Sequence, residues 1–322
     1  MENFKAMGNM KRLETLCIAG AVAVLAVSCG KEGAVREDRA SEVEFTASEL
    51  QVKTVFGEKA DGAYPVLWTS NEKVALFYNS QTGDQTGGGQ YADVLPSADG
   101  HTAGFSASFT DDGNGSHSFY AMSPLSALNG MGNEDWDGNG VNEKILYANI
   151  PYDQIPVPGT CDEKAQIVFA KEEFSEFPDK VDLTFSHMTA YGLITSLSLP
   201  EEATEIVGLT IESDKFLSGE IYCNYNTPET ILCNAKKAQK YIYLDVNNGG
   251  LKAKTLENVF FACTPQTDGN DVFGEGDYLK FKVYTDTDTW VKTVNFSADR
   301  TLAFKAGRIS SFSVSAHGFE KQ

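Results

Sequence analysis

The sequence lacks the common signatures of catalysis and of nucleic-acid binding. Only four histidines occur among its 322 residues, and it contains no nucleophile-elbow, HExxH or P-loop motif. Lysine and arginine number 26 against 45 aspartate and glutamate residues, which gives a net charge of −19 at pH 7. Nucleic-acid binding needs a basic face, and this balance argues against one. We therefore expect no enzyme, no cofactor and no nucleic-acid partner, and a surface-exposed protein kept soluble by its acidic charge.

Long apolar runs are also missing. The longest, residues 16–27, is shorter than the ~20 residues that cross a bilayer. It follows Lys11 and Arg12 and ends in small residues before Cys29, which is typical of a secretory signal. The pattern resembles a bacterial lipoprotein signal, in which a peptidase cuts before the cysteine and fatty acids such as palmitate are attached to it. We predict a signal peptide over 1–28 and lipidation of Cys29, the alternative being a buried hairpin helix.

The stretch after Cys29 is charged and rich in small residues, without apolar periodicity. We predict a flexible tether over 29–41. Its start, Gly30-Lys31-Glu32, resembles the short charged signal that directs some lipoproteins to the outer face of the outer membrane. Ordinary linker polarity explains these three residues equally well. The expected location is the outer membrane and cell surface, through a lipid anchor, or a fimbrium.

Cysteine is scarce in the mature chain. Four remain after the predicted cleavage: Cys161, Cys223, Cys233 and Cys263. No CxxC motif and no zinc-type spacing is present, so we expect no metal held by cysteine. Cys223 and Cys233 could bridge a hairpin in an oxidising compartment, but four cysteines allow three pairings. Buried thiols that act as small apolar residues are an equal alternative.

Helical periodicity is rare, and only 164–177 fits a short helix. Alternation of apolar and polar residues is frequent instead, most clearly in DYLKFKVYT at 277–285. Many short alternating runs separated by turn residues predict an all-β protein built as sandwiches or barrels. An irregular, proline-containing stretch at 151–180 marks the predicted junction between a domain at 42–178 and one at 179–322.

One polar insertion invites a calcium site. In NEDWDGNGVNE, Asp135, Asp137 and Asn139 alternate before a glycine, as oxygen ligands do in calcium loops. The acid expected at the twelfth position is missing, because Leu146 stands there. An Asp/Asn/Gly-rich turn also needs no metal, since its side chains bond their own backbone. We therefore expect an ordinary turn, with calcium as the weaker alternative.

The three tryptophans and His187 are the remaining candidates. Trp68 and Trp290 lie in strand-like runs, so we expect them in the core. Trp136 lies in the polar insertion and is a candidate sugar contact. His187 stands between apolar strand residues, which favours a structural role over a catalytic one.

Four segments, taken in order, resemble the fimbrillin-like proteins, which are lipoprotein-derived pilus subunits and anchors of Gram-negative gut and oral bacteria. In that family a tryptophan precedes a tight turn and a strand, an F-x-H-x-x-A strand opens the second half, and F-x-A-G-x-x-x-x-F closes the chain. The turn after Trp68 carries Asn71-Glu72 where the family usually has Gly-Asp. The segments are FTAS at 45–48, VLWTSNEKVALFY at 66–78, LTFSHMTAYGLITSLSL at 183–199 and FKAGRISSFSV at 304–314.

The resemblance implies two transthyretin-like antiparallel β-sandwich domains and assembly by β-strand exchange between subunits. It also implies that a trypsin-like protease cuts after an arginine near the N-terminus, for which Arg36 and Arg39 are the candidates. Both precede the first expected strand at 45–48. A cut there would release the lipid without opening a groove, so an anchor or accessory role stands beside a stalk role.

The sequence therefore predicts a cell-surface, fimbrillin-like lipoprotein that serves as stalk, anchor or tip component of an adhesive pilus. Its expected partners are other pilus subunits, the outer membrane through the lipid, and an unidentified surface receptor. The alternative is a glycan-binding surface lipoprotein of a polysaccharide-uptake system. An exposed aromatic platform would favour that alternative, and burial of Trp68 and Trp290 would count against it.

Overall fold

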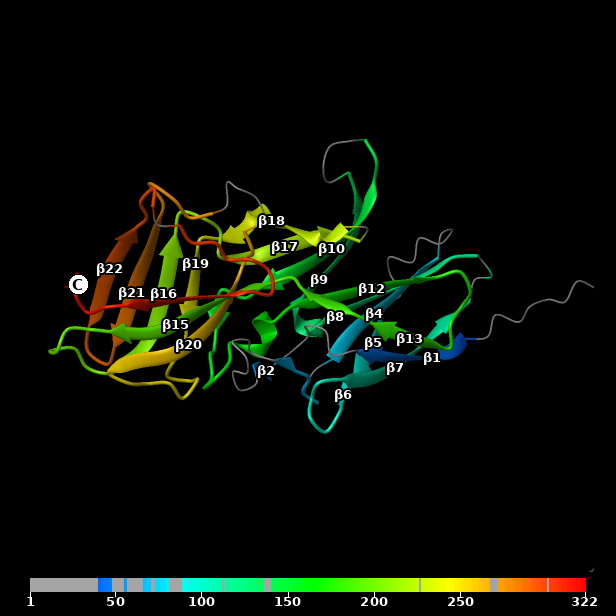
Figure 1. Ribbon diagram of the computed structural model, residues 1–322, viewed down its shortest axis with the longest axis horizontal. Coiled ribbons are helices and arrows are strands. Elements are labelled where there is room, and N and C mark those ends of the chain that lie inside the picture. Colours follow the sequence, from blue (N-terminus) through cyan, green and yellow to red (C-terminus); the bar gives the residue numbers. More distant parts are fainter. Residues whose placement is uncertain are drawn as a thin grey trace, which may run out of the picture. The chain divides into compact units, whose positions relative to one another are not determined.

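The computed structural model describes most of the chain after residue 39 (Figure 1). The predictions for the signal, Cys29, Arg36 and Arg39 lie outside the described residues, and so does the predicted tether except for residues 40 and 41, which begin strand β1. The account below concerns the compact unit Asp38–Gln322. The described residues are 40–47, 55–56, 66–70, 73–80, 89–111, 113, 115–135, 140–225, 227–266, 272–299 and 301–322.

The all-β prediction is confirmed. In the described residues the only helical elements are two single 3₁₀ turns, η1 (Leu125–Ala127) and η2 (Glu163–Ala165). The short helix predicted at 164–177 is wrong, because this stretch holds η2 and then strand β12 (Val168–Phe174). β12 is a central strand with Val168, Phe169 and Ala170 all buried, and burial on both faces removes the alternation that would identify a strand.

Two sheets form a sandwich from the first half of the chain together with β13 and β14. The first sheet has the order β13 (Lys180–Leu183), β1 (Ala40–Ala47), β7 (Ala103–Thr110), β6 (Leu95–Pro96). The second has the order β14 (Phe185–His187), β12, β8 (His117–Ser123), β4 (Lys73–Ser80), β5 (Gln90–Asp93). A separate pair joins β2 (Val55–Phe56) and β3 (Val66–Leu67).

A third sheet covers the other face of the second. Its order is β18 (Thr227–Gln239), β17 (Ser218–Asn224), β10 (Glu143–Ile150), β9 (Leu128–Glu134). Phe77, Met122 and Phe169 from the second sheet share one core with Leu146 and Ile221 from the third. Because the second sheet is covered on both faces, β4 reads as a continuous buried run rather than an alternating one.

The C-terminal part forms another sandwich. Its core joins Leu209, Phe281 and Trp290 from one sheet to Ile194 and Phe261 from the other. The fourth sheet has the order β11 (Asp153–Gln154), β19 (Tyr241–Leu244), β16 (Ile206–Ser213), β21 (Tyr278–Thr285), β22 (Thr289–Asn295), β24 (Glu320–Lys321). The fifth has the order β20 (Thr255–Cys263), β15 (Ala190–Ser198), β23 (Ile309–Val314).

Several sheets combine strands from both sides of residue 178. β1 pairs with β13, β12 with β14, and β10 with β17. Strands from the two predicted domains thus share sheets, and the division at 42–178 and 179–322 stays a prediction.

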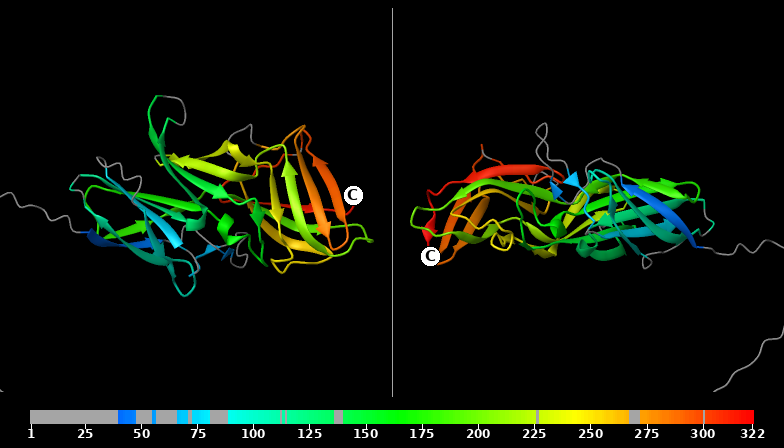
Figure 2. Two further views of the ribbon diagram at one scale, coloured as in Figure 1. Left: turned by 180° about the vertical axis from the view of Figure 1, so that it is seen from behind. Right: turned by 90° about the horizontal axis from the view of Figure 1, so that it is seen from below.

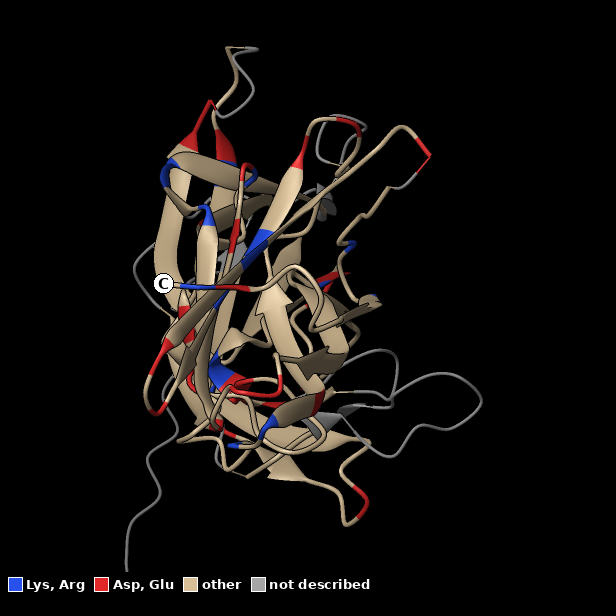
Figure 3. Ribbon diagram, turned by 90° about the vertical axis from the view of Figure 1, so that its left-hand side faces the viewer, with Lys and Arg blue, Asp and Glu red and all other residues tan. Residues whose placement is uncertain are grey.

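Many aspartate and glutamate residues lie in loops and at strand ends (Figure 3), where solvent screens their mutual repulsion.

Candidate functional site

Strand β1 fills a slot in the first sheet. It runs parallel to β13 on one side and antiparallel to β7 on the other. The register with β7 is continuous from Ala40 to Ala47, and Glu44 N–H donates to the Asp179 carbonyl at 3.0 Å. β1 is also the first strand of the described chain, so an interior strand of the first sheet comes from the N-terminal end of the described residues.

One face of β1 is embedded in an aromatic core. Val43 and Ala47 are fully buried, and Phe45 is 1% exposed. The Phe45 ring lies 5.7 Å from the rings of Phe105 and Phe119, measured between centroids. Burial of Val43 and Phe45 contributes ~1.5–3 kcal/mol each. The slot therefore takes a strand with apolar residues at alternate positions, the larger two of them where Val43 and Phe45 lie.

The other face of β1 is polar. Glu42 and Glu44 are exposed, and the Thr46 hydroxyl donates to the Asp182 carboxylate of β13. That hydrogen bond, and a contact to Lys180 at 3.1 Å, lower the pKa of Asp182. This side of the slot therefore offers a polar anchor for the strand beside β13.

The chemistry of the slot follows from its two neighbours. If β1 left, β7 and β13 would each present a row of unpaired backbone N–H and C=O groups, with an apolar trench between them. Such an edge accepts an added strand, whose main chain supplies hydrogen bonds and whose alternate side chains fill the trench.

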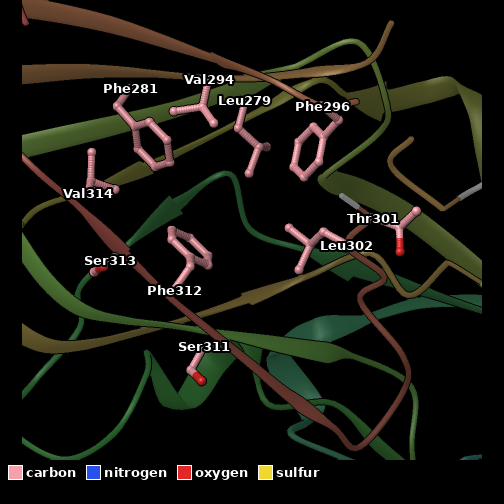
Figure 4. A pocket seen from close by; sticks show the side chains of 10 residues that line it. All are labelled: Leu279, Phe281, Val294, Phe296, Thr301, Leu302, Ser311, Phe312, Ser313 and Val314. Carbon is pink, nitrogen blue, oxygen red and sulfur yellow. The ribbon is translucent and has the colours of Figure 1, made fainter. Parts of the chain in front are cut away.

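A second surface of this kind lies at β23, the edge strand of the fifth sheet, seen in red along the margin in the right-hand view of Figure 2. Its sequence, ISSFSV, has no charge and no proline, the devices that usually protect edges. Figure 4 shows Phe281, Leu279 and Phe296 pointing towards Phe312 and Leu302. They line an apolar hollow of about 200 Å³ beside this edge.

The opposite edge of the fifth sheet is covered at one point. The side-chain amide of Gln154 donates to the Ala262 carbonyl at 2.7 Å, and its oxygen accepts the Ala262 N–H at 2.9 Å. Gln154 is 1% exposed, so its amide takes the place of a paired strand at β20. The two edges of this sheet thus differ, and β23 is the more open.

The tryptophans behave as core residues where they are described. Trp68 and Trp290 are each 3% exposed, which confirms the expectation for both. Their burial counts against an exposed aromatic platform and so against the glycan-uptake alternative. Trp136 lies outside the described residues and stays a candidate sugar contact.

His187 is buried, and its Nδ1 lies 3.0 Å from the Tyr191 hydroxyl. Thr189 donates to the same hydroxyl at 3.0 Å. Burial raises the pKa of Tyr191 well above its ordinary value, so the phenol stays protonated. The histidine belongs to a packed network, which fits the structural role predicted for it.

The calcium candidate is described only in part. Asp137 and Asn139 lie outside the described residues, and Asp135 accepts the Gly140 N–H at 3.0 Å. That bond is one an ordinary turn makes. Among the residues that the structure does describe, no cluster of three or more His, Cys, Asp or Glu side chains could hold a metal.

Cys161, Cys223 and Cys263 are buried and Cys233 is partly buried, and these four form no disulfide with one another. Cys223 and Cys233 do lie on neighbouring strands, β17 and β18, opposite Ile231 and Ile221 respectively. In the described part of the chain, no helix is long and apolar enough to cross a membrane.

The sequence alone misses two parts of the site. β1 begins at Ala40, five residues before the strand expected at 45–48, because its first two residues fall in the predicted tether over 29–41 and the charges of Glu42 and Glu44 on its wet face obscure the strand pattern. Its pairing with β13, far along the chain, leaves no local signal. The alternation Val43, Phe45, Ala47 was the one available indication.

No family model and no curated protein matches the chain. Solved structures do resemble it. A candidate cell adhesion protein from Bacteroides ovatus is 12% identical with a TM-score of 0.48, covering 89% of this chain and 96% of its own. A second candidate cell adhesion protein, from Bacteroides thetaiotaomicron, is 16% identical with a TM-score of 0.41, covering 86% and 93%. A fimbrial assembly protein from Parabacteroides distasonis is 11% identical with a TM-score of 0.39, covering 88% and 94%.

These structures are proteins of the kinds that the fimbrillin-like resemblance names. At such identities and TM-scores they add no argument about what this chain binds or how it assembles. The strand slot and the open edge carry the functional argument instead.

Proposed function

We propose that the protein is a cell-surface component of an adhesive pilus, held to the outer membrane by lipid on Cys29 and joined to other subunits by β-strand exchange. The observation that carries the proposal is the position of β1. A central strand supplied by the chain's own N-terminal end is the element most easily replaced by a strand from a neighbour. The fimbrillin-like motifs at 66–78, 183–199 and 304–314 support the same assignment.

The slot sets the requirements for an incoming strand. It must continue the register of β7 and β13, and it must place large apolar residues where Val43 and Phe45 lie. A strand without them would forfeit ~3–6 kcal/mol of apolar burial, at ~1.5–3 kcal/mol for each side chain. Replacement is therefore selective for a strand of matching alternation.

The position of the proteolytic cut decides which role the protein can take in the pilus. β1 starts at Ala40, so a cut after Arg36 or Arg39 removes the lipid and leaves the slot filled. The next basic residues are Lys53 and Lys59, and a cut there would detach β1. The chain with β1 in place acts as an anchor or accessory subunit, and only loss of β1 makes it an acceptor in a stalk.

Two matched cut sites test this proposal. A recognition sequence for a site-specific protease is placed between residues 48 and 54 in one variant and between residues 36 and 39 in the other. Both chains fold with β1 covalently attached and are then cut. We expect unheated gels to show SDS-resistant oligomers after the first cut and monomers after the second. Monomers after clean cutting at both sites would contradict strand exchange at β1.

The open edge at β23 is tested in the same assay. Ser311→Lys adds a charge to that edge, which opposes pairing with a further strand. If exchange occurs at the β1 slot, this variant forms oligomers as the parent does. Loss of oligomers in Ser311→Lys would move the acceptor site to β23.

A further inference from the structure

A polar hollow of about 340 Å³ opens on the third sheet. It lies on the face turned away from the second sheet, because its residues Tyr147 and Glu220 alternate with the core-facing Ala148 and Ile221. Its volume falls in the range of small-molecule pockets, ~300–1,000 Å³. Neither β1 nor β23 contributes to it, so its role is independent of strand exchange.

A buried carboxylate forms the floor of the hollow. Glu220 is 1% exposed, and its oxygens accept hydrogen bonds from the Asn129 amide, the Asn234 amide at 2.6 Å and the Lys237 ammonium at 2.8 Å. Burying a carboxylate costs several kcal/mol unless it is paired. Replacing a buried ion pair by apolar residues of similar volume often leaves a protein at least as stable. A fully partnered network of this kind fixes the positions of all four polar groups.

The backbone is shaped to build this network. β17 pairs Gly219 with Ala238 and Ile221 with Cys233, so the residues between Cys233 and Ala238 bulge out of β18. Asn234 and Lys237 come from this bulge. A Cβ at Gly219 would lie 2.5 Å from the Lys237 carbonyl oxygen, so glycine is required there. Bulges commonly redirect side chains beside functional sites.

An aromatic ring forms the opposite wall. A Cβ at Gly132 would lie 3.0 Å from the Tyr147 ring, so the glycine gives the ring room beside the hollow. The Tyr147 hydroxyl bonds the Glu134 carboxylate, and burial together with that carboxylate raises the pKa of Tyr147 well above its ordinary value. The phenol therefore stays a donor at neutral pH.

The residues that line the hollow have hydrogen-bond donors and acceptors left for a ligand. Lys237 has three N–H groups and uses one on Glu220, and the amides of Asn129 and Asn234 keep further N–H or C=O capacity. An anion would meet the carboxylates of Glu134 and Glu220, and a cation would meet Lys237. Hydroxyl groups both donate and accept, and a pyranose also has a C–H face that packs on an aromatic ring.

We infer that this hollow binds a neutral carbohydrate, with Tyr147 against the sugar ring and Lys237, Asn234 and Glu134 bonding its hydroxyls. The site needs none of the tryptophans. It gives the protein a direct contact with glycan-covered surfaces.

Saturation-transfer NMR on the intact protein tests the inference. The probes are the methyl glycosides of glucose, galactose, mannose, fucose and N-acetylglucosamine, with arginine methyl ester and inorganic phosphate as charged probes. We expect transfer to at least one neutral glycoside and at least a tenfold loss of affinity in Lys237→Ala and in Tyr147→Ala. Lys237→Ala leaves the buried Glu220 carboxylate without its cationic partner, which lowers stability, so circular dichroism checks that each variant is folded. Glu134 is exposed, so Glu134→Ala keeps the fold and should show the same loss of affinity, which decides the matter if the other two variants unfold.

Matched controls come from the fourth sheet. Lys280 bonds Glu212 at 2.8 Å, and Tyr284 packs against Tyr243, which repeats the same chemistry outside the hollow. Lys280→Ala and Tyr284→Ala should leave glycoside binding unchanged. Three results would overturn the inference: no glycoside binds, only a charged probe binds, or Lys237→Ala binds as the parent does.

Discussion

Replacing Phe45 by alanine tests how tightly β1 is held. Phe45 is 1% exposed and contacts the rings of Phe105, Phe109 and Phe119 with centroids 5.7 to 6.2 Å apart. A buried Phe→Ala change costs ~3–5 kcal/mol, from lost transfer energy and the cavity left behind. Because ~1 kcal/mol shifts the melting temperature of a domain of ~150–250 residues by ~2–4 °C, we expect a fall of about 6–20 °C.

The assay is thermal unfolding followed by circular dichroism. Glu44→Ala is the matched control, since Glu44 neighbours Phe45 on the exposed face of the same strand and exposed substitutions usually stay within ~0.5 kcal/mol. If Phe45→Ala lowers the melting temperature by less than about 3 °C, which corresponds to ~1 kcal/mol, the embedding of β1 described above is wrong. An equal fall in Glu44→Ala would contradict it as well.

Three further predictions concern the cores. Tyr191→Phe should lower the free energy of unfolding by ~0.5–1.5 kcal/mol, since the Tyr191 hydroxyl bonds His187 and Thr189. Tyr225→Phe should not lower it, because the buried Tyr225 hydroxyl has no partner among the described residues. Urea unfolding in which Tyr225→Phe is the less stable of the two variants would refute this. Gly192→Ala should cost ~1–3 kcal/mol in the same assay, because its Cβ would lie 2.0 Å from the Phe261 ring, and a neutral result would contradict that packing. Burial raises the pKa of Tyr191 and of Tyr225 well above 10. The stability that depends on keeping these phenols protonated is therefore complete below pH ~10 and is lost as the pH rises further. Ultraviolet titration should show both tyrosines ionising only as the protein unfolds, and ionisation before unfolding would refute their burial.

Alternation predicted the half-buried strands well. The run at 277–285 becomes β21, with Leu279, Phe281 and Val283 buried and the residues between them partly exposed. Such a strand has one wet face, and its local pattern reports its surroundings directly. The positions of Trp68 and Trp290 in apolar runs likewise predicted their burial.

Elements defined by distant partners could not be predicted. β12 lies in a sheet covered on both faces, so its sequence carries no alternation and was interpreted as helix. The pairing of β1 with β13 joins Phe45 to Val181, a relation that no local pattern contains. The hollow around Glu220 depends on a register shift between β17 and β18, which is a property of two strands together.

The exchange of a labelled β1 strand tests the central claim most directly. The protein cut between residues 48 and 54 is incubated with a fluorescent peptide of residues 40–47, and with the same peptide carrying the Phe45→Asp change. We predict that the first peptide migrates with the protein on an unheated gel and that the second does not. The Asp side chain of the second peptide would be an unpaired charge buried in the trench between β7 and β13, against Phe105 and Phe119, and burying such a charge is strongly unfavourable. Retention of both peptides, or of neither, would contradict the claim that this slot accepts a strand from another chain.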